Sequence, residues 1–336
     1  MTPKKLVVNK GAILDTVIVH VQDWRRAWLR NCDVQAPLCA CPDDGTEFLP
    51  MPLNPEKLLT LKIPDVEHMY GPKDCMLYAL GLGLGQDPLN ADELAFVYEK
   101  NLKVLPTFAV MQGYAAYWLR LPEIGVTWEK VVHGEQGLKL HAPVAPQGTV
   151  IGRTRILDVV DKGEGNGALI YSQREIVDKA SGRLLATLAQ TTFCRGDGGF
   201  GGPKRETPPP HALPARVPDG VVDLVTRPEM ALIYRLSGDV NALHVDPQFA
   251  KAAGFPRPVL HGLATFGVAG HALLKAVCGY DPARLTAMAG RFSAPVYPGE
   301  TIRTEFWRDG NVISFRARVV ERDVVAIDRG RAEVTG

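Results

Sequence analysis

"VLHGLATFGVAGHALLKAV", residues 259–277, would place apolar side chains on almost every side of a helix. It follows Pro258, and a helix that is apolar all round lies buried inside a protein. Residues 301–334 contain three runs rich in β-branched and aromatic residues, separated by turn residues such as "RDGN". Such runs are typical of antiparallel strands. The sequence therefore predicts an α+β fold, in which a long buried helix is wrapped by a curved antiparallel sheet.

The same pattern occurs twice in the chain. "YALGLGLGQD", which begins at Tyr78, parallels "YRLSGDVNAL", which begins at Tyr234. "LPTFAVMQG" around Thr107 parallels "LATFGVAGH" around Thr265, and "APVAPQG" parallels "APVYPGE" in the same order and at nearly the same separation. Two tandem copies of one fold explain this better than chance, so each copy is expected to contain a long helix and its own sheet.

Proline marks the connection between the two copies. Residues 201–220, "GGPKRETPPPHALPARVPDG", are rich in proline, which lacks a backbone donor and resists both helix and sheet. We interpret this segment as a semi-rigid linker between an N-terminal copy at 51–200 and a C-terminal copy at 221–336. Residues 1–50 contain no part of the repeat. We interpret them as a dispensable extension, with Met51 at the start of the compact region.

Composition argues against several classes of function. The 336-residue chain has a formal net charge of +1, which gives no basic surface for nucleic acid or for an anionic membrane. No apolar run approaches the roughly 20 residues that cross a bilayer. The six cysteines are scattered, as in proteins of a reducing compartment, and the start of the chain lacks the features of a signal peptide. We therefore expect a cytoplasmic protein with no nucleic-acid or membrane partner.

Cys39 and Cys41 form a Cys-x-Cys pair that raises the question of a metal site. Only Cys32 and His20 are nearby, whereas a zinc site requires two such pairs at finger-like spacing. We therefore expect no metal ion here, and no metal or other cofactor in the protein.

The candidate catalytic residues lie in "YRLSGDVNALHVD", residues 234–246. Asp239 and His244 would point about 140° apart on a helix, so they meet only if the chain curls back on itself. A carboxylate and an imidazole that converge can hold a water and exchange the protons needed to add it to a double bond. Asn241 could orient this pair or a substrate carbonyl. The alternative is an ordinary polar turn, since these residue types are common in loops. The first copy has none of the three at its matching positions.

Gly262 lies in the first turn of the expected buried helix, where backbone N–H groups have no helical acceptor. Because glycine has no side chain, a ligand could approach this N–H closely. The N–H and the helix dipole would then stabilise negative charge on a thioester oxygen. The alternative is that Gly262 only permits tight helix–sheet packing. His261 is either a hydrogen-bond donor behind the candidate pair or simply a polar residue at a helix start, and we favour the second interpretation. We interpret His271 as a core or edge histidine.

These motifs resemble the hydratase 2 group of the MaoC-like dehydratases, the double hot-dog enzymes that hydrate trans-2-enoyl-CoA to (3R)-3-hydroxyacyl-CoA. The likeness rests on "YRLSGDVNALHVDP" and spans about 51–336 through "LPTF", "HGEQ", "DKG", "GGFGG", "LHGL" and "RFSAPVYPG". The chain is particularly similar to the hydratase part of the peroxisomal multifunctional enzyme type 2. The resemblance implies a lyase of fatty-acid β-oxidation type that acts on an acyl-CoA thioester.

The resemblance also implies roles for individual residues. Asp239 and His244 would be the catalytic pair, Asn241 their orienting neighbour, and Gly262 the oxyanion donor. Contacts with the acyl-CoA would come from four further residues: His133, Gly134, Lys162 and Phe292. The N-terminal copy would shape the acyl pocket without a catalytic pair. Ala242 stands where the family usually has proline, a departure that loosens the loop but removes no reacting group.

Two other functions remain open from the sequence. A hot-dog thioesterase would direct the activated water at the thioester carbonyl and release free CoA. An acyl-CoA-binding protein would hold the thioester without turning it over. A homodimer is compatible with each of these functions, although a tandem chain already pairs its own copies.

Overall fold

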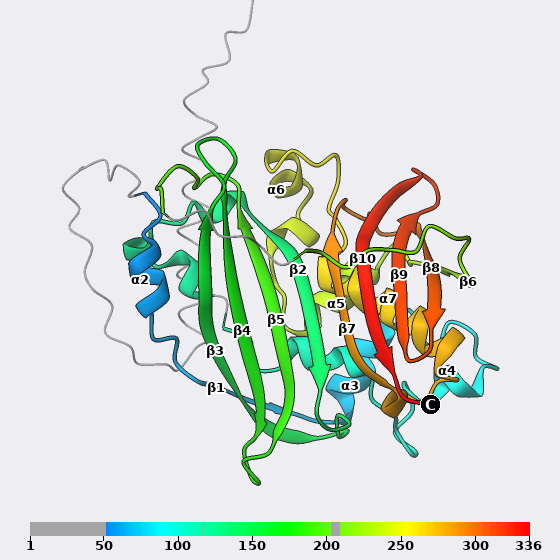
Figure 1. The fold of residues 1–336 in the computed structure, drawn as a ribbon. Coiled ribbons are helices and arrows are strands. Elements are labelled where there is room, and N and C mark those ends of the chain that lie inside the picture. Colours follow the sequence, from blue (N-terminus) through cyan, green and yellow to red (C-terminus); the bar gives the residue numbers. More distant parts are fainter. Residues whose placement is uncertain (1–51, 116, 203–208) are drawn as a thin grey trace, which may run out of the picture. The chain divides into compact units, whose positions relative to one another are not determined.

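Residues 52–115, 117–202 and 209–336 are described by a computed structural model. Within them the strands form a ten-stranded sheet in the order β1-β3-β4-β5-β2-β7-β10-β9-β8-β6, with α3, α5 and α7 on one of its faces (Figure 1). The first half contains β1 (Val66–Tyr70), β2 (Val131–Leu140), β3 (Gly148–Asp161), β4 (Ala168–Asp178) and β5 (Leu184–Cys194). The second half contains β6 (Gly220–Val225), β7 (Leu285–Phe292), β8 (Thr301–Asp309), β9 (Val312–Val319) and β10 (Val324–Val334).

The two halves of the sheet have the same connectivity. In the first half β1 pairs with β3, β3 with β4, β4 with β5 and β5 with β2, all antiparallel. The second half repeats this order through β6, β8, β9, β10 and β7. The halves join where β2 pairs with β7, and the matching tyrosines Tyr78 and Tyr234 are both buried with ring centroids 5.7 Å apart. The tandem repeat expected from the sequence is therefore confirmed.

Helix α7 (Gly262–Val277) is the long buried helix that the sequence predicts, and the second half of the sheet curves around it (Figure 1). A Cβ added to Gly267 would lie 2.6 Å from Leu82, and one added to Gly270 would lie 2.8 Å from Thr107. Both neighbours belong to the first half. Glycine at these positions therefore allows α7 to pack closely against the first half as well as against its own sheet.

The expectation of a long helix in the first half is wrong. At the matching place "LPTFAVMQG" forms only a short 3-10 helix, η1 (Pro106–Met111). Pro106 fixes its first position, and Gly113, with a left-handed φ of 54°, turns the chain shortly after its end. The other helical segments described here are also short: α2 (Pro55–Thr60), α3 (Pro72–Leu80), α4 (Ala91–Leu94), η2 (Tyr117–Arg120), η3 (Pro122–Ile124) and η4 (Trp128–Lys130).

A short helix, α6 (Pro247–Ala252), follows the candidate catalytic loop. The Asp246 side chain accepts hydrogen bonds from the N–H groups of Gln248 and Phe249, so it caps the helix. Gly254, with a φ of 88°, follows its end. The remaining helical segments of the second half are α5 (Met230–Tyr234), η5 (Arg235–Ser237), η6 (Ala242–His244) and η7 (Pro282–Arg284).

Residues 209–219, the described end of the proline-rich segment, contain no helix or strand. They are fastened to the second half. The indole N–H of Trp307 donates to the carbonyl of Arg216 at 2.7 Å, and the ring of His211 lies 2.8 Å from the hydroxyl of Ser314. The predicted extension, the Cys32, Cys39 and Cys41 thiols and residues 203–208 lie outside the described residues, so the predictions made for them stay predictions.

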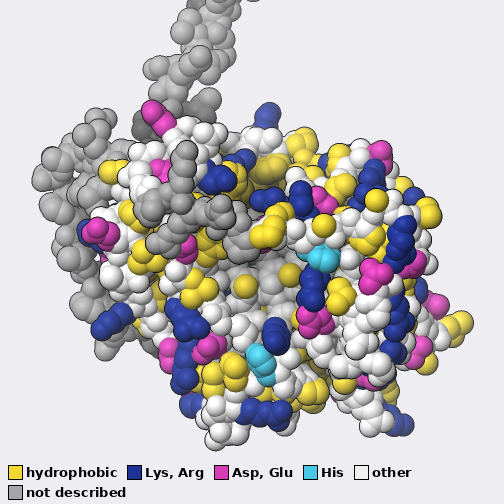
Figure 2. All heavy atoms as spheres, in the orientation of Figure 1, with side chains coloured by type: hydrophobic (Ala, Val, Ile, Leu, Met, Phe, Trp, Pro, Cys, Tyr) yellow, Lys and Arg dark blue, Asp and Glu magenta, His cyan; other side chains and the backbone are white. Residues whose placement is uncertain are grey.

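Charged side chains of both signs are interspersed on the face of the molecule shown in Figure 2. Several arginines of the second half form ion pairs: Arg303 with Asp223, Arg316 with Glu305, Arg318 with Asp323, and Arg331 with Glu333. This pairing interrupts the positive charge along these strands. In the part of the chain that the structure describes, every helix is too short or too polar to span a bilayer.

Candidate active site

The loop between α5 and α6 brings Asp239 and His244 together. The 3-10 turn η5 ends at Ser237, and the next residue, Gly238, has a φ of 123° that reverses the chain in a conformation that favours glycine. The second 3-10 turn, η6, then carries His244. The chain therefore curls back between the two residues, as their spacing in the sequence required.

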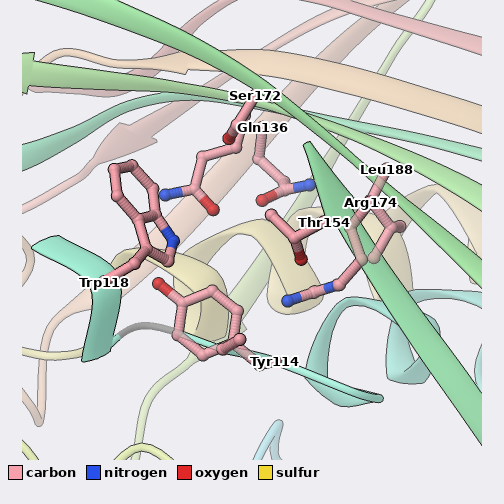
Figure 3. Close-up of a pocket in the computed structure, with 9 residues that line it drawn as sticks. Tyr114, Trp118, Gln136, Thr154, Ser172, Arg174 and Leu188 are labelled. Carbon is pink, nitrogen blue, oxygen red and sulfur yellow. The ribbon is translucent and has the colours of Figure 1, made fainter. Parts of the chain in front are cut away.

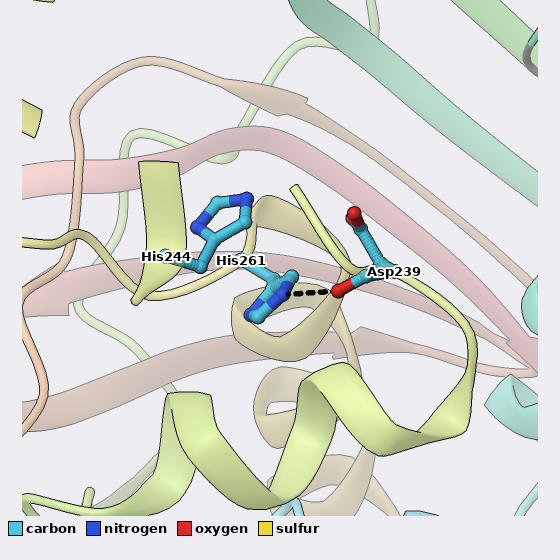
Figure 4. A group of neighbouring side chains, drawn as sticks. All are labelled: Asp239, His244 and His261. Atoms are coloured by element: carbon cyan, nitrogen blue, oxygen red, sulfur yellow. Dashed lines mark hydrogen bonds between the residues drawn. The ribbon is translucent and has the colours of Figure 1, made fainter. Parts of the chain in front are cut away.

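A third residue, His261, completes a cluster with this pair. One carboxylate oxygen of Asp239, one ring nitrogen of His244 and one ring nitrogen of His261 all lie within 4.8 Å of one another. The two imidazole rings stack with their centroids 3.6 Å apart (Figure 4). His261 is the N-cap residue of α7, so the stack fixes the candidate catalytic loop against the start of the buried helix.

Hydrogen bonding assigns the proton on the His244 ring. Its Nδ1 lies 2.8 Å from the carbonyl oxygen of Val259, and because a carbonyl can only accept, Nδ1 carries the proton and Nε2 keeps a lone pair. Burial lowers the pKa of His244 from 6.5, although the charge of Asp239 and the bond to Val259 act in the opposite direction. At neutral pH the ring is therefore uncharged and presents a proton acceptor to the site.

His261 holds both members of the pair in place. Its Nε2 donates to the backbone carbonyl of Asp239 at 3.1 Å, which is the dashed line in Figure 4. Burial and the neighbouring His244 lower the pKa of His261 to about 4, so this ring is also neutral. The interpretation of His261 that the sequence favoured, a plain polar helix start, missed these contacts, whereas the alternative of a hydrogen-bond donor allowed for them. The available signal was its position directly before Gly262, at the start of the only long apolar helix expected in the second copy.

Asn241 acts on the backbone of the loop. Its side-chain oxygen accepts from the N–H of Leu243 at 3.1 Å and so caps η6, the turn that carries His244. Its own N–H donates to the carboxylate of Asp239 at 3.3 Å. Asn241 therefore shapes the turn between Asp239 and His244, and its role in orienting the pair or a substrate carbonyl stays a prediction.

The other wall of the site crosses the seam between β2 and β7. His133 on β2 and Phe292 on β7 meet edge to face, with ring centroids 5.0 Å apart. A Cβ on Gly262 would lie 3.5 Å from the Phe292 ring, so Gly262 is also in this contact group. Gly262 is the first residue of α7, and its N–H donates to no residue that the structure describes. Burial lowers the pKa of His133 to about 4, although the charge of Asp239 raises it.

Matches to known proteins follow the two halves of the sheet. Residues 211–329 match the family described as "MaoC like domain", and residues 68–196 match "MFE-2 hydratase 2 N-terminal domain". The chain is 38% identical over 299 residues to "Enoyl-CoA hydratase 2, peroxisomal" of Arabidopsis thaliana, which covers 84% of this chain and 96% of that protein. The chain belongs to the MaoC-like hydratase 2 family.

Solved structures of MaoC-like proteins share the fold. A MaoC-like dehydratase from Phytophthora capsici superposes with a TM-score of 0.75 at 34% identity, covering 84% of this chain and 98% of that one. The multifunctional enzyme type 2 of Drosophila melanogaster superposes with a TM-score of 0.69 at 36% identity, covering 81% of this chain and 48% of that one. The family resemblance and the double hot-dog fold expected from the sequence are confirmed. Where in the cell this chain is located stays a prediction.

The remaining two residues that the hydratase 2 resemblance singled out have neighbours in the first half of the sheet. Gly134 follows His133 at an irregularity of β2, and its missing side chain leaves space beside the carbonyl of Thr191. Lys162 lies exposed in the loop after β3. Beside it, the carboxylate of Asp161 accepts from the N–H groups of Gly199 and Gly201. The "DKG" and "GGFGG" motifs of this MaoC-like chain therefore meet at one end of the sheet.

Donor atoms suited to a metal ion also occur in this hydratase 2 site. The Asp239 carboxylate and the unprotonated ring nitrogens of His244 and His261 are the atoms that could bind one. The Asp239 carboxylate and the His244 ring nitrogen could equally well hold a water molecule in place of a metal ion. The expectation that the protein needs no metal ion stays a prediction.

Proposed function

We propose that this MaoC-like protein adds water reversibly to trans-2-enoyl-CoA and forms (3R)-3-hydroxyacyl-CoA. The observation that carries the proposal is the convergence of two proton acceptors, the Asp239 carboxylate and Nε2 of His244, at the start of a buried helix. The name of the Arabidopsis relative, "Enoyl-CoA hydratase 2, peroxisomal", supports the same reaction.

The two acceptors orient one water for attack. A carboxylate oxygen and an imidazole lone pair can only accept, so a water between Asp239 and His244 donates one hydrogen to each. Its oxygen lone pairs then point away from the pair, toward C3 of the enoyl group. As the O–C3 bond forms, one acceptor takes a proton from the water and acts as general base.

The electrons of the double bond move through C2 onto the thioester oxygen. The N–H of Gly262, at the positive end of the α7 dipole, stabilises the negative charge that develops there. C2 then receives the proton that the pair took from the water. Atoms and charge balance with water alone, so the reaction uses no oxidant or reductant. Because one cluster supplies both the hydroxyl and the proton, they add to the same face of the double bond. A substrate held with one face toward the cluster then gives a single configuration at C3.

The remaining residues hold the thioester. Phe292 and His133 would line the substrate beside Gly262, since these residues form one contact group. Lys162 supplies an exposed cation for the CoA phosphates. The first half of the sheet would hold the acyl chain. A thioesterase would use the same pair differently, because its water would attack C1 and release free CoA.

Three assays on the full chain test this proposal. Loss of the enoyl absorbance of trans-2-enoyl-CoA esters measures hydration, chiral chromatography assigns the product, and a thiol reagent detects free CoA. Asp239→Asn should lower the rate by about 10²–10⁴-fold, because an amide cannot accept the proton. Asp246→Asn is the matched control, since asparagine caps a helix as well as aspartate does. Release of CoA without loss of the enoyl group, or a (3S) product, would contradict the proposal.

A further inference from the structure

A polar pocket lies against the inner face of the first half of the sheet (Figure 3). Along β4 the buried alternate positions run Ile170, Ser172, Arg174 and Ile176, so two polar residues interrupt an apolar row. The strand register places Arg174 opposite Thr154 on β3. The polar and aromatic part of the wall comes from seven residues: Tyr114, Trp118, Gln136, Thr154, Ser172, Arg174 and Gln190.

Arg174 is the charged group of this pocket. Its side chain is 7% exposed, Nη2 donates to the carbonyl of Val110 at 2.6 Å, and the guanidinium lies 4.8 Å from the centre of the Tyr114 ring. Its Nε has no hydrogen-bond partner, and no carboxylate among the described residues forms an ion pair with it. Burying a cation without a counter-charge is costly, so these contacts leave the charge of Arg174 uncompensated.

The pocket has further donors and little space. The hydroxyls of Thr154 and Ser172 line it, and neither forms a hydrogen bond with another described residue. Its open volume is about 20 Å³, which is comparable with the space that one ordered water needs. A small planar acceptor such as a carboxylate suits these dimensions and donors, whereas a bulky ring does not.

The pocket and the catalytic pair are within electrostatic reach of each other. Burial raises the pKa of Tyr114, which Arg174 lowers and Asp239 raises. The same two charges act in opposite directions on His133. Gln136, in the pocket wall, is three residues along β2 from His133, a distance of about 10 Å on a strand. This is the distance that an acyl chain bound beside His133 would cover along β2 to bring its end to the pocket.

We infer that the preferred substrate is an enoyl-CoA whose acyl chain ends in a second carboxylate, which Arg174 binds in the first half while Asp239 and His244 act on the other end. The carboxylate accepts from Arg174 and from the hydroxyls of Thr154 and Ser172, so it supplies the missing counter-charge. A methyl end would leave the buried guanidinium unpaired. The inference rests on the proposed function only in taking an acyl-CoA as the ligand.

Binding of saturated thioesters tests the inference without any catalytic step. Hexanoyl-, octanoyl- and decanoyl-CoA are compared by calorimetry with their ω-carboxy counterparts, using the full chain. At the best-fitting length the ω-carboxy ester should bind about tenfold tighter or more, the range of a charge-assisted hydrogen bond. Arg174→Met should abolish the preference, and Arg174→Lys should retain part of it. Arg155→Met, an exposed arginine of the neighbouring strand, is the matched control.

The inference would be overturned if the unmodified protein bound the methyl-ended esters equally well or more tightly at every length. It would also be overturned if the preference for the ω-carboxy ester survived in folded Arg174→Met. If that variant does not fold, Thr154→Val and Ser172→Ala should each weaken the preference, and no change in either would count against it. Failure to hydrate any enoyl-CoA, with the binding preference intact, would reject the proposed function and leave standing the binding of the ω-carboxylate by Arg174.

Discussion

The two halves of the sheet share one strand order but differ on their inner faces. The second half wraps α7, and its loop carries Asp239 and His244. In the first half only the short η1 stands at the matching place, and β4 turns Ser172 and Arg174 inward. When Tyr78 is aligned with Tyr234, Gly83 stands where Asp239 does. The comparison teaches that strand pairing builds the same framework twice, whereas the inward side chains and the segment crossing the sheet decide what each copy can bind.

Loss of the catalytic pair is expected to have the largest effect, and it tests whether chemistry belongs to the second half alone. His244→Gln should lower turnover by about 10²–10⁴-fold, because the amide cannot take a proton. The double variant with Asp239→Asn should be little worse than either single one, since groups that act on one water are not additive. His141→Gln, an exposed histidine of the first half, should leave turnover unchanged. Steady-state hydration rates decide this, and a folded His244→Gln protein with normal turnover would break the comparison.

Two glycines of α7 separate the catalytic end of the helix from the part packed against the first half. In Gly262→Ala the new methyl would lie 3.5 Å from Phe292, an ordinary contact, so the fold should persist. The methyl would, however, stand beside the N–H that faces the thioester. We expect turnover to fall by roughly 10²-fold, as when an oxyanion donor is lost.

Gly270→Ala is the counterpart on the same helix. Its methyl would lie 2.8 Å from Thr107, so overpacking should lower the free energy of unfolding by about 1–3 kcal/mol, partly offset by the higher helix propensity of alanine. Turnover per folded molecule should stay near normal. Denaturant unfolding and steady-state rates measure both variants. The distinction fails if Gly262→Ala is the less stable protein or Gly270→Ala the less active one.

The pH dependence tests the electrostatic link between Asp239 and His244. His244 must be neutral to accept a proton, and burial lowers its pKa from 6.5. Turnover should therefore be constant at pH values above the lowered pKa of His244 and fall only when the pH drops below that pKa. Asp239→Asn removes a charge that raises the pKa of His244, so this pKa should move further down. Titration of the His244 ring by NMR in both proteins measures the shift, and an upward shift would contradict the geometry.

The smallest expected effect concerns the first residue of η6, where Ala242 replaces the usual proline. Asn241 has φ −56° and ψ 128°, which suits a residue before proline, and the N–H of Ala242 donates to no described residue. In the first half η1 already begins with Pro106. Ala242→Pro should therefore raise the free energy of unfolding by about 0.4–1 kcal/mol, with turnover unchanged. Denaturant unfolding measures the gain, and lower turnover in the stabilised variant would show instead that the loop must move during turnover.

Periodicity and local chemistry were sufficient to predict the elements of the second half. The apolar run before Val277 could only be a buried helix, and the cap at Asp246 and the turns between the last strands depend on neighbouring residues alone. The meeting of Asp239 and His244 is also a local feature, because two side chains five residues apart can converge when the loop between them curls back. The prediction of a long helix in the first half was wrong because it relied on similarity to the second copy. Pro106 and Gly113, which limit the helix here to a short turn, were present in the sequence.

Tertiary structure decided everything that depends on register across the sheet. His261 meets His244 only because α7 begins beneath the loop, and His133 meets Phe292 only because β2 pairs with β7. Arg174 on β4 reads as an ordinary charged residue of an alternating strand. Its burial follows from which face of β4 turns inward and from the segment at Tyr114 that covers it. Such contacts join residues far apart in the chain, and the physical reason they escape local patterns is that register and packing are set by all the strands together.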